Sequence, residues 1–218
     1  MVKKIKKQSA RSPRVAQKRK RARREILSVA QRILLRDGPD AMTLASVAGE
    51  LGMTKPAIYH YFPSKEALVR ALVTALLEEE IDSVVMAIDQ QEDDSKVLGT
   101  LIRAFYEHYA DRLDALRVVY GQMQLMSASA VTFDEATLTE QVHPRTRRLF
   151  DTLEARLSGN TRSARKRRQV RQLAFTAWTS ALGLMTMISV ADSSNDPLAH
   201  PQDELLATLC RVYDQAVA

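Results

Sequence analysis

Hydrophobic residues recur at intervals of three and four along most of the chain, which is the spacing of a buried helix face. The pattern predicts helices over about residues 19–37, 43–51, 54–62, 64–90, 93–110, 111–126, 144–158, 161–191 and 202–217. No segment alternates apolar and polar residues with the β-branched enrichment that strands show. The chain is therefore predicted to be all-α, with residues 127–139 as a loop.

Two of the predicted helices are short and lie close together, between Thr43 and Phe62. Thr43 stands immediately before the first of them, where a side-chain oxygen can accept a backbone amide. Gly52 can take the left-handed conformation that ends this helix, and Thr54 is expected to cap the second one. Two short helices joined in this way form a helix-turn-helix. The side chains expected on the outer face of the second helix are Lys55, Ala57, Tyr59, His60 and Tyr61.

This stretch resembles the DNA-binding domain of the tetracycline-repressor (TetR) family. The residues that carry the resemblance are Gly38, Thr43, Val47, Leu51, Gly52, Ile58, Tyr59, Tyr61, Phe62, Ser64, Lys65 and Leu68. They span about residues 24–70, and the spacing Y-x-Y-F-x-S-K-x-x-L behind two capped short helices is specific. The remaining two thirds of the chain resembles the family only in its helical character and its length.

The resemblance implies that the second short helix enters the major groove of DNA. The matching positions for DNA contact are Thr43, Thr54, Lys55, Pro56, Ala57, Tyr59, His60 and Lys65. Lys55 can donate to guanine O6 or N7, and Pro56 or Ala57 can touch a thymine methyl group. The hydroxyl groups and the Lys65 ammonium better suit phosphates, which fix the register without reading sequence.

Other interpretations of these side chains remain open. Tyr59 and Tyr61 can instead pack within the small domain, and His60 can meet a base, a phosphate or only solvent. Ala45 offers DNA no polar group from the first short helix. Direct base readout is therefore expected to be sparse, which increases the expected contribution of contacts outside the helix-turn-helix.

Positive charge is concentrated before the helix-turn-helix. The 218-residue chain has a net charge of +6, but residues 1–24 hold twelve Lys and Arg and no acid, while residues 25–65 are neutral. Residues 1–18 are predicted to form a disordered arm, because they lack the apolar residues that would offset the entropy of ordering. The arm either follows the phosphate backbone or is a solvated tail without fixed contacts.

The pattern divides the chain into three parts. Residues 1–18 are the basic arm, residues 19–63 are the helix-turn-helix DNA-binding domain, and residues 64–218 are a helical domain for effector binding and dimerisation. The helix predicted at residues 64–90 has no internal glycine or proline. It can therefore join the DNA-binding domain to the rest of the chain as a rigid lever.

The last two predicted helices are candidates for a protein interface. Residues 173–190 carry no charge and follow a basic cluster, so a membrane span is one interpretation. A span needs about twenty residues, however, and this stretch contains several Ser and Thr residues. Burial between two protomers is the better account. We therefore predict a homodimer in which the helices at 161–191 and 202–217 form half of a four-helix bundle, as the resemblance also implies.

Aromatic residues and one methionine in the C-terminal part are candidates for an effector pocket. They are Phe105, Tyr109, Tyr120, Met123, Phe175 and Trp178. Small-molecule sites combine such side chains with a few polar groups. The same residues also fit a plain hydrophobic core, so the expectation of a pocket rests on the resemblance.

Signals for enzymatic or metal chemistry are poor. The four histidines show no paired ligand spacing, and there is no Gly-rich phosphate loop. Cys210 is the single cysteine, which excludes an intrachain disulfide and suits a reducing cytoplasm. The basic N-terminus has no apolar segment behind it, so no signal peptide is expected. We expect no enzyme, no metal and no cofactor.

The sequence thus predicts a cytoplasmic, sequence-specific DNA-binding transcriptional regulator. The resemblance favours a repressor that a small-molecule effector releases from its operator. Two other classes of protein stay open. One is a DNA-binding structural or interaction protein of the same fold without a small ligand, and the other is a membrane-anchored regulator held by residues 173–190.

Overall fold

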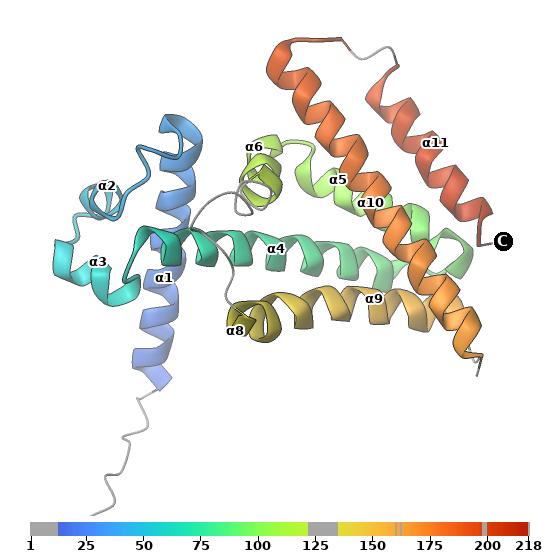
Figure 1. Ribbon diagram of the computed structural model, residues 1–218, viewed down its shortest axis with the longest axis horizontal. Helices are drawn as coiled ribbons and strands as arrows, with labels where there is room; N and C mark the ends of the chain where they lie inside the picture. Colours follow the sequence, from blue (N-terminus) through green and yellow to red (C-terminus); the bar gives the residue numbers. More distant parts are fainter. Residues whose placement is uncertain (1–12, 122–134, 160, 162, 198–199, 218) are drawn as a thin grey trace, which may run out of the picture. The chain divides into compact units, whose positions relative to one another are not determined.

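The secondary structure of the chain is helical. The computed structural model describes residues 13–121, 135–159, 161, 163–197 and 200–217, and no strand occurs in these ranges. The helices in Figure 1 are α1 (Pro13–Asp37), α2 (Leu44–Glu50), α3 (Lys55–Tyr61), α4 (Lys65–Gln90), α5 (Val97–Tyr109), α6 (Leu113–Leu116), α8 (Glu135–Thr137), α9 (His143–Ser158), α10 (Ala164–Ser194) and α11 (Gln202–Gln215). Short helical turns are η1 (Asp94–Lys96), η2 (Arg117–Gly121) and η3 (Leu138–Val142). The predicted all-α fold is confirmed.

The first helix begins earlier than its apolar pattern predicts. α1 starts at Pro13 rather than at residue 19, so residues 13–18 of the predicted arm are helical. Proline is favourable at the start of a helix, because its missing amide has no partner there in any case. The Arg, Ala, Gln and Lys residues that follow have high helix propensity. The expectation of disorder is therefore wrong for residues 13–18, whereas residues 1–12 lie outside the described residues.

The middle of the chain also differs from the prediction. Instead of one helix over residues 111–126, α6 ends at Leu116 and the π-helical turn η2 follows as far as Gly121. The predicted loop at 127–139 is helical from Glu135 onward, because α8 and η3 lead directly into α9. Glu, Gln, Leu and Ala are good helix formers, which explains this second difference. Residues 122–134 lie outside the described part.

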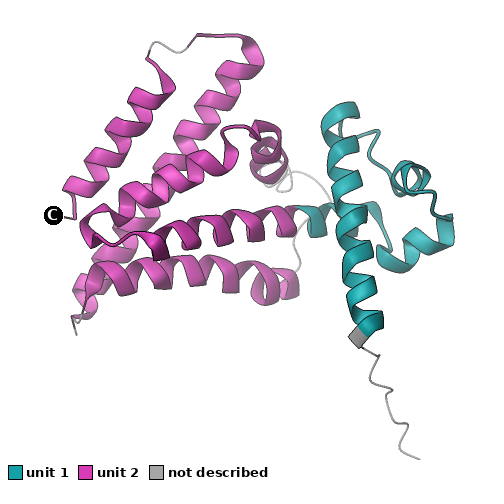
Figure 2. Cartoon of the chain, turned by 180° about the vertical axis from the view of Figure 1, so that it is seen from behind, with its two compact units in different colours: residues 1–72 teal, residues 73–218 magenta. Residues whose placement is uncertain are grey.

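The described chain forms two compact units that divide between Leu72 and Val73, within α4 (Figure 2). In the first unit α2 packs against both α1 and α3. The side chains at its centre are fully buried, and they include Ile26, Ile33, Val47, Ile58 and Phe62. The core expected from the sequence is thus present, except that Leu51, at the end of α2, is only half-buried.

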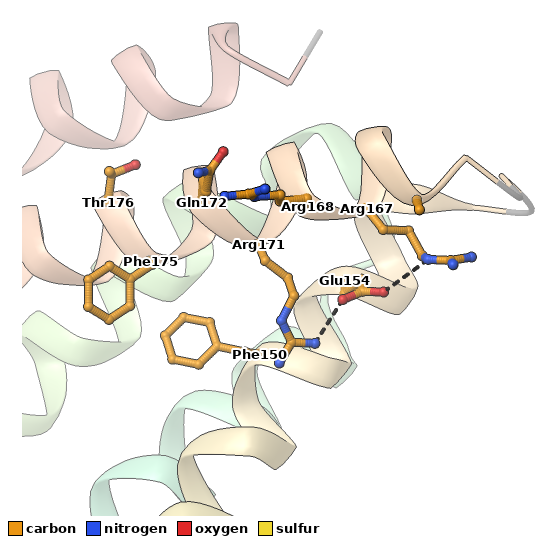
Figure 3. A pocket seen from close by; sticks show the side chains of 9 residues that line it. Phe150, Glu154, Arg167, Arg168, Arg171, Gln172, Phe175 and Thr176 are labelled. Atoms are coloured by element: carbon orange, nitrogen blue, oxygen red, sulfur yellow. Dashed lines mark hydrogen bonds and ion pairs between the residues drawn. The ribbon is translucent and has the colours of Figure 1, made fainter.

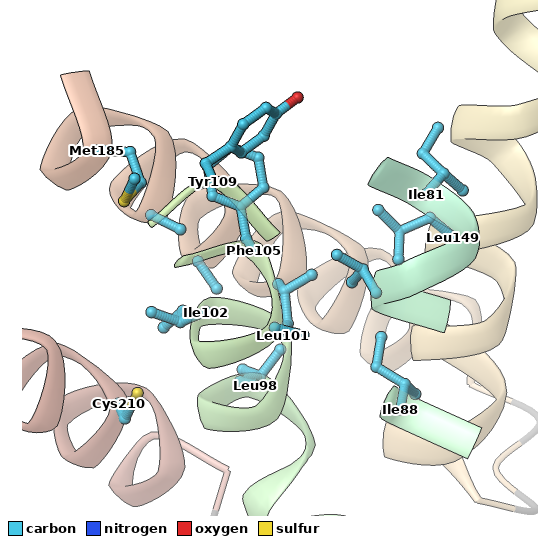
Figure 4. Close-up of a cluster of buried hydrophobic side chains, with 14 of the residues drawn as sticks. Ile81, Ile88, Leu98, Leu101, Ile102, Phe105, Tyr109, Leu149, Met185 and Cys210 are labelled. Atoms are coloured by element: carbon cyan, nitrogen blue, oxygen red, sulfur yellow. The ribbon is translucent and has the colours of Figure 1, made fainter. Parts of the chain in front are cut away.

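The second unit is built around α5, which packs against α9, α10 and α11. Figure 4 shows the buried cluster, whose labelled residues are Ile81, Ile88, Leu98, Leu101, Ile102, Phe105, Tyr109, Leu149, Met185 and Cys210. The carboxylate of Asp214 on α11 accepts the backbone amide of Gly99 on α5 at 2.8 Å. A side chain at Gly99 would meet that carboxylate at 2.6 Å, so the glycine allows the close approach of α11.

Candidate functional site

The first short helix of the candidate DNA-binding unit is fixed by its N-terminal cap. The Thr43 hydroxyl accepts the Ser46 amide at 3.0 Å, and the Ser46 hydroxyl accepts the Thr43 amide at 3.0 Å. Ser46 also donates to the carbonyl oxygen of Ala41 at 2.8 Å. These bonds satisfy amides that have no partner inside the helix. The Thr43 hydroxyl is therefore held at the start of α2.

The turn that follows α2 sets the position of α3. Gly52 has a φ of 61°, in the left-handed region that glycine adopts without steric cost. The Met53 amide then donates to the carbonyl oxygen of Ala48 at 2.8 Å, which closes the end of α2. Thr54 occupies the cap position of α3, but its hydroxyl makes no capping hydrogen bond, so the side-chain cap expected from the sequence is wrong. The exposed hydroxyl is left available for a phosphate.

The outer face of α3 carries most of the predicted contact residues. Ile58 on α3 and Phe62 just after it are buried. Exposed side chains on the other faces of α3 are Lys55, Pro56, Tyr59 and His60, and Ala57 is half-buried. Tyr59 is 44% exposed, which removes packing as the main account of its ring. Tyr61 is half-buried and its ring meets that of His60 edge-on at 5.7 Å.

Lys55 is the basic side chain of α3 without an acidic partner. Among the described residues, no carboxylate lies within ion-pair distance of it, and its ammonium lies 6.0 Å from the centre of the Tyr59 ring. Arg36, in contrast, contacts Asp37 and Glu50 at 2.6 and 2.8 Å. Pairing with carboxylates reduces the attraction of a guanidinium for phosphate, whereas Lys55 keeps its full charge for DNA.

Lys65 lies at the start of α4 and has a neutral partner. Its ammonium donates to the carbonyl oxygen of Pro39 at 2.6 Å, which ties the start of α4 to the loop between α1 and α2. An ammonium has three donors, so two remain for a phosphate oxygen. The predicted contact at Lys65 is therefore compatible with a structural role for the same side chain.

Arg23 is a residue of this unit whose role the sequence analysis missed. Its guanidinium lies 4.3 Å from the centre of the Phe62 ring and donates to the carbonyl oxygen of Tyr61 at 2.9 Å. Burial, and then the nearby Arg19, lower the pKa of Arg23. The available signal was its spacing of three from Ile26, which places it on the inner face of α1. Arg23 thus fastens the end of α3 to α1.

The N-terminal half of α1 is strongly basic. Its cationic side chains are Arg14, Lys18, Arg19, Lys20, Arg21, Arg23 and Arg24. No acid occurs before Glu25, and most of these side chains are exposed. Clustered Lys and Arg on one element are the electrostatic signature of nucleic-acid binding. The first unit therefore combines a helix-turn-helix with a separate source of positive charge.

Comparison with known sequences agrees with this geometry. The sequence model of the family described as "Bacterial regulatory proteins, tetR family" matches residues 26–72, which hold the C-terminal half of α1, all of α2 and α3, and the start of α4. Residues 26–72 are a TetR-family DNA-binding domain. Its α2 and α3 are the DNA-binding helix-turn-helix of this TetR-family regulator.

Known relatives and solved structures share the same fold. The nucleoid occlusion factor SlmA of Edwardsiella ictaluri is 28% identical over 155 residues, which cover 70% of this chain and 71% of that protein. A transcriptional regulator of the TetR/AcrR family from Thermobifida fusca aligns with a TM-score of 0.65 at 20% identity, covering 89% of this chain and 97% of that one. A TetR variant from Acinetobacter baumannii in complex with minocycline gives 0.55 at 18% identity, covering 88% and 92%.

The predicted pocket residues of the TetR-family regulator do not form one cavity wall. Phe105 and Tyr109 are buried, Tyr120 and Trp178 are half-buried, and Met123 lies outside the described residues. Ring contacts link the four described residues: Phe105 meets Tyr109 at 5.2 Å and Tyr120 at 6.2 Å, and Tyr120 meets Trp178 at 6.4 Å. The structure therefore places these four together as an aromatic cluster inside the second unit.

Phe175 lies at the surface, at the edge of this cluster, where its ring is 5.7 Å from that of Trp178. It is 52% exposed and lines an open hollow of about 820 Å³ between α9 and α10 (Figure 3). Phe150 forms the opposite wall, and Arg167, Arg168 and Arg171 stand beside it. Arg171 contacts both Asp151 and Glu154 at 2.7 Å, and these carboxylates raise its pKa. Phe175 is thus an exposed residue of α10 that meets the aromatic cluster through Trp178.

Glu80 is a second residue that the sequence analysis missed, because it closes an acidic run that looks like a solvated surface. Its side chain is buried on α4 and accepts hydrogen bonds from the hydroxyls of Tyr109 at 2.7 Å and Tyr120 at 2.8 Å. Burial raises the pKa of Glu80, and hydrogen bonds from Tyr109, Tyr120 and Trp178 oppose that rise. Its spacing of four from Leu76 was the available signal, since it places the acid on the buried face.

Metal chemistry has no visible site in the ranges that the structure covers. No group of three His, Cys, Asp or Glu side chains gathers there. Cys210 is buried, and burial is the main cause that raises the pKa of its thiol. A buried thiol with a raised pKa is a poor nucleophile.

Proposed function

We propose that this TetR-family regulator is a cytoplasmic homodimeric repressor, released from its operator by a small-molecule effector. The observation that carries the DNA part is the exposed face of α3, where Lys55 has no carboxylate within ion-pair distance among the described residues and Tyr59 is 44% exposed. The basic N-terminal half of α1 supplies further positive charge for DNA phosphates. In this proposal the two α3 helices of a dimer enter major grooves about one helical turn apart.

Binding to a promoter tests the repressor proposal directly. The purified chain is titrated against labelled DNA from the promoter region of its own gene, at low salt and again at physiological salt. We expect tight binding to the promoter DNA and an affinity that falls steeply as salt increases, because the proposed contacts include many phosphates. Absence of binding to that region at low salt would contradict the repressor proposal.

Lys55 is expected to carry base recognition. Replacing it, as Lys55→Met, should weaken operator binding about tenfold and reduce discrimination between operator and random DNA, because a donor to guanine is lost. Arg36→Met is the matched control, since Arg36 is exposed on the same unit but is occupied by Asp37 and Glu50. Fluorescence anisotropy with both DNAs measures the two effects. Equal losses on operator and random DNA would assign Lys55 to phosphate contact alone.

The dimer is proposed to form through α10 and α11. One face of α10 leaves Phe175, Met187 and Val190 exposed, and Val212 is exposed on α11. A hollow of about 490 Å³ lies between the two helices, lined by side chains such as Leu184 and Leu205. Apolar side chains exposed along a helical hairpin favour burial against a second copy. The two hairpins would form the predicted four-helix bundle.

The exposed apolar side chains of α10 could also be explained by a membrane-anchored regulator. By length and composition, α10 is the one helix among the described residues that is long and apolar enough to cross a bilayer, and 33% of its apolar window is buried. Core helices pass the same test, and α10 buries Ala174, Ala177, Ala181 and Met185 in its own unit. Cell fractionation separates the proposals, because a dimer partner leaves the protein in the soluble fraction.

The proposed effector site is the aromatic cluster of Phe105, Tyr109, Tyr120 and Trp178 around Glu80. An effector bound there would favour one placement of α4, which begins with the DNA-binding unit and carries Glu80. That placement sets the separation of the two α3 helices, so the effector shifts the population of DNA-binding dimers. The effector can be found by measuring the melting temperature of the protein with each member of a metabolite panel. A molecule that binds the folded state and not the unfolded state raises the melting temperature.

Nucleoid occlusion is the second candidate function. The observation that favours it is the 28% identity to nucleoid occlusion factor SlmA, which extends beyond the DNA-binding unit. This function corresponds to a DNA-binding protein that needs no small effector. Mapping the bound sites across the chromosome separates the two candidates. Sites spread over many positions support nucleoid occlusion, and sites confined to one or a few promoters support the repressor.

Glu80 is expected to make stability depend on pH. Because its folded-state pKa is raised, the folded chain retains a proton that the unfolded chain has lost between the ordinary and the raised pKa. The free energy of unfolding therefore falls as pH rises through that window. Tyr109 and Tyr120 stay protonated there, since burial and Glu80 raise their pKa values. Urea unfolding between about pH 4 and pH 8 measures the slope.

Two variants separate Glu80 from the other acids in this test. Glu80→Gln keeps the shape but cannot ionise, so its stability relative to the wild type should increase with pH. Glu79→Gln removes an exposed carboxylate next to it in sequence, which pairs with Arg112 at 3.2 Å, and should leave the slope unchanged. A constant difference between Glu80→Gln and wild type at all pH values would contradict the assignment.

A further inference from the structure

Arg23 differs from most other cationic side chains of the basic half of α1 in where it lies. Arg21 and Arg24, close to it in sequence, are exposed, whereas Arg23 is half-buried. Its guanidinium lies 4.3 Å from the centre of the Phe62 ring and donates to the carbonyl oxygen of Tyr61 at 2.9 Å. Neither partner is an acid, and both belong to the end of α3. This arginine is therefore engaged inside the DNA-binding unit.

The two contacts act at the C-terminal end of α3. Tyr61 is the last residue of this helix, and the carbonyl groups of a last turn lack partners inside their own helix. A cation at that end also interacts favourably with the helix dipole. At the other end, the Thr54 hydroxyl makes no capping hydrogen bond. α2 packs against both α1 and α3, and Arg23 adds a direct link between α1 and α3.

The angle of α3 decides which atoms of DNA its side chains reach. α3 has seven residues, so it is about 10 Å long. A tilt of about 10° at Tyr61 moves the Lys55 end by about 2 Å, which exceeds the range of distances over which a hydrogen bond to a base forms. Attraction to phosphates falls slowly with distance and tolerates such a shift. Loosening the end of α3 therefore costs base recognition more than general attraction to DNA.

We propose that Arg23 is a positioning residue that determines the sequence specificity of this regulator. It acts through the Phe62 ring and the Tyr61 carbonyl, which hold α3 at the angle that base contacts require, and not by contacting phosphate. The guanidinium suits this role because it lies over the ring while one of its nitrogens donates to the carbonyl. A lysine ammonium is a compact point charge and does not span both partners. The inference rests on the DNA-binding part of the proposed function and deepens it.

The conservative variant Arg23→Lys tests the proposal, because it keeps the charge and removes the guanidinium. The full-length wild-type protein first selects its preferred site from a library of random DNA. Anisotropy then measures affinity for that site and for unselected DNA. Arg23→Lys is expected to bind the selected site about tenfold more weakly, since a hydrogen bond from a charged group is lost. Its affinity for unselected DNA should stay within about twofold of the wild type, because the charge remains.

Arg24→Lys is the matched control, because Arg24 is exposed and follows Arg23 directly. It should bind both DNAs as the wild type does. Arg23→Met should show the same preferential loss on the selected site as Arg23→Lys. A phosphate contact would instead be retained by lysine and, in Arg23→Met, lost on both DNAs alike. That pattern, or equal losses on both DNAs in Arg23→Lys, would overturn the proposal.

A double-mutant cycle with Phe62→Leu shows whether Arg23 acts through the ring. Phe62→Leu removes the ring and keeps an apolar side chain in the core. It should reduce discrimination between the two DNAs in the wild type and much less in Arg23→Lys, because the two residues share one interaction. Circular dichroism melts confirm that each variant is folded at the assay temperature. Additive losses, or a lower melting temperature with unchanged discrimination, would assign Arg23 to folding stability alone and refute the positioning role.

The same measurements separate this inference from the proposed function. A selected site that the promoter of the chain's own gene lacks contradicts the repressor proposal, while Arg23 is still judged on the selected site. Promoter binding together with unchanged discrimination by Arg23→Lys keeps the repressor and removes the positioning role. A wild type that selects no preferred site has no specificity for Arg23 to determine, and that result removes the inference as well.

Discussion

Replacing Met187 and Val190 with glutamate is expected to convert the protein to a monomer and to lower its operator affinity by about 10²- to 10⁴-fold. Both side chains are more than half exposed on α10, at 58% and 54%, on the face proposed to meet a second copy. Charges buried in that interface would lack partners, so the dimer would be strongly disfavoured. With one α3 helix per particle, the second half-site no longer contributes to binding. Sedimentation and anisotropy measure the two effects.

Met86→Glu is the control for this prediction. Met86 is 58% exposed, as Met187 is, but it lies on α4. It introduces the same charge in place of the same side chain, and it should leave both the dimer and operator affinity intact. If Met86→Glu dissociates the dimer as strongly, or if the double variant remains a dimer with wild-type affinity, the interface lies elsewhere.

Deleting residues 2–12 is expected to weaken DNA binding about a hundredfold at physiological salt and to flatten its salt dependence. This segment contains Lys3, Lys4, Lys6, Lys7 and Arg11 and no acid. Each phosphate contact contributes about −0.9 to the slope of log affinity against log salt, so five lost contacts change the slope by about four to five. The deletion ends at residue 12 because α1 begins at Pro13. Anisotropy titrations at several salt concentrations give the slope.

A chain of full length with those five residues changed to Gln controls for the loss of length. It should show the same flatter slope as the deletion, because charge rather than chain length makes the contribution. An unchanged slope in both variants would assign the segment to a solvated tail. A change in the deletion alone would point to contacts made by the backbone instead of by the cationic side chains.

Local signals determined the DNA-binding unit. Caps and apolar spacing act within a few residues, so the sequence around Thr43, Gly52 and Phe62 was enough to place α2 and α3. The same signals gave the family by resemblance, and the residue pattern of that family gave the candidate DNA contacts. The apolar pattern predicted a start for α1 that is too late, at residue 19 instead of Pro13. Residues 13–18 are helical because of their helix propensity, although they carry no apolar face. Such a face marks burial rather than the end of a helix.

Tertiary structure alone decided which side chains meet across the fold. The acidic run at Glu78, Glu79 and Glu80 looks uniform in sequence, yet only Glu80 is buried, because its direction on α4 faces α5 and η2. Its partners Tyr109 and Tyr120 are 29 and 40 residues away, a distance over which sequence periodicity carries no information. Phe175, expected in the same pocket, is exposed on α10 and meets the aromatic cluster at its edge, through the Trp178 ring. The sequence by itself determined a helical DNA-binding regulator of the TetR family, and packing between distant helices determined which acid is buried and which side chains hydrogen-bond to it.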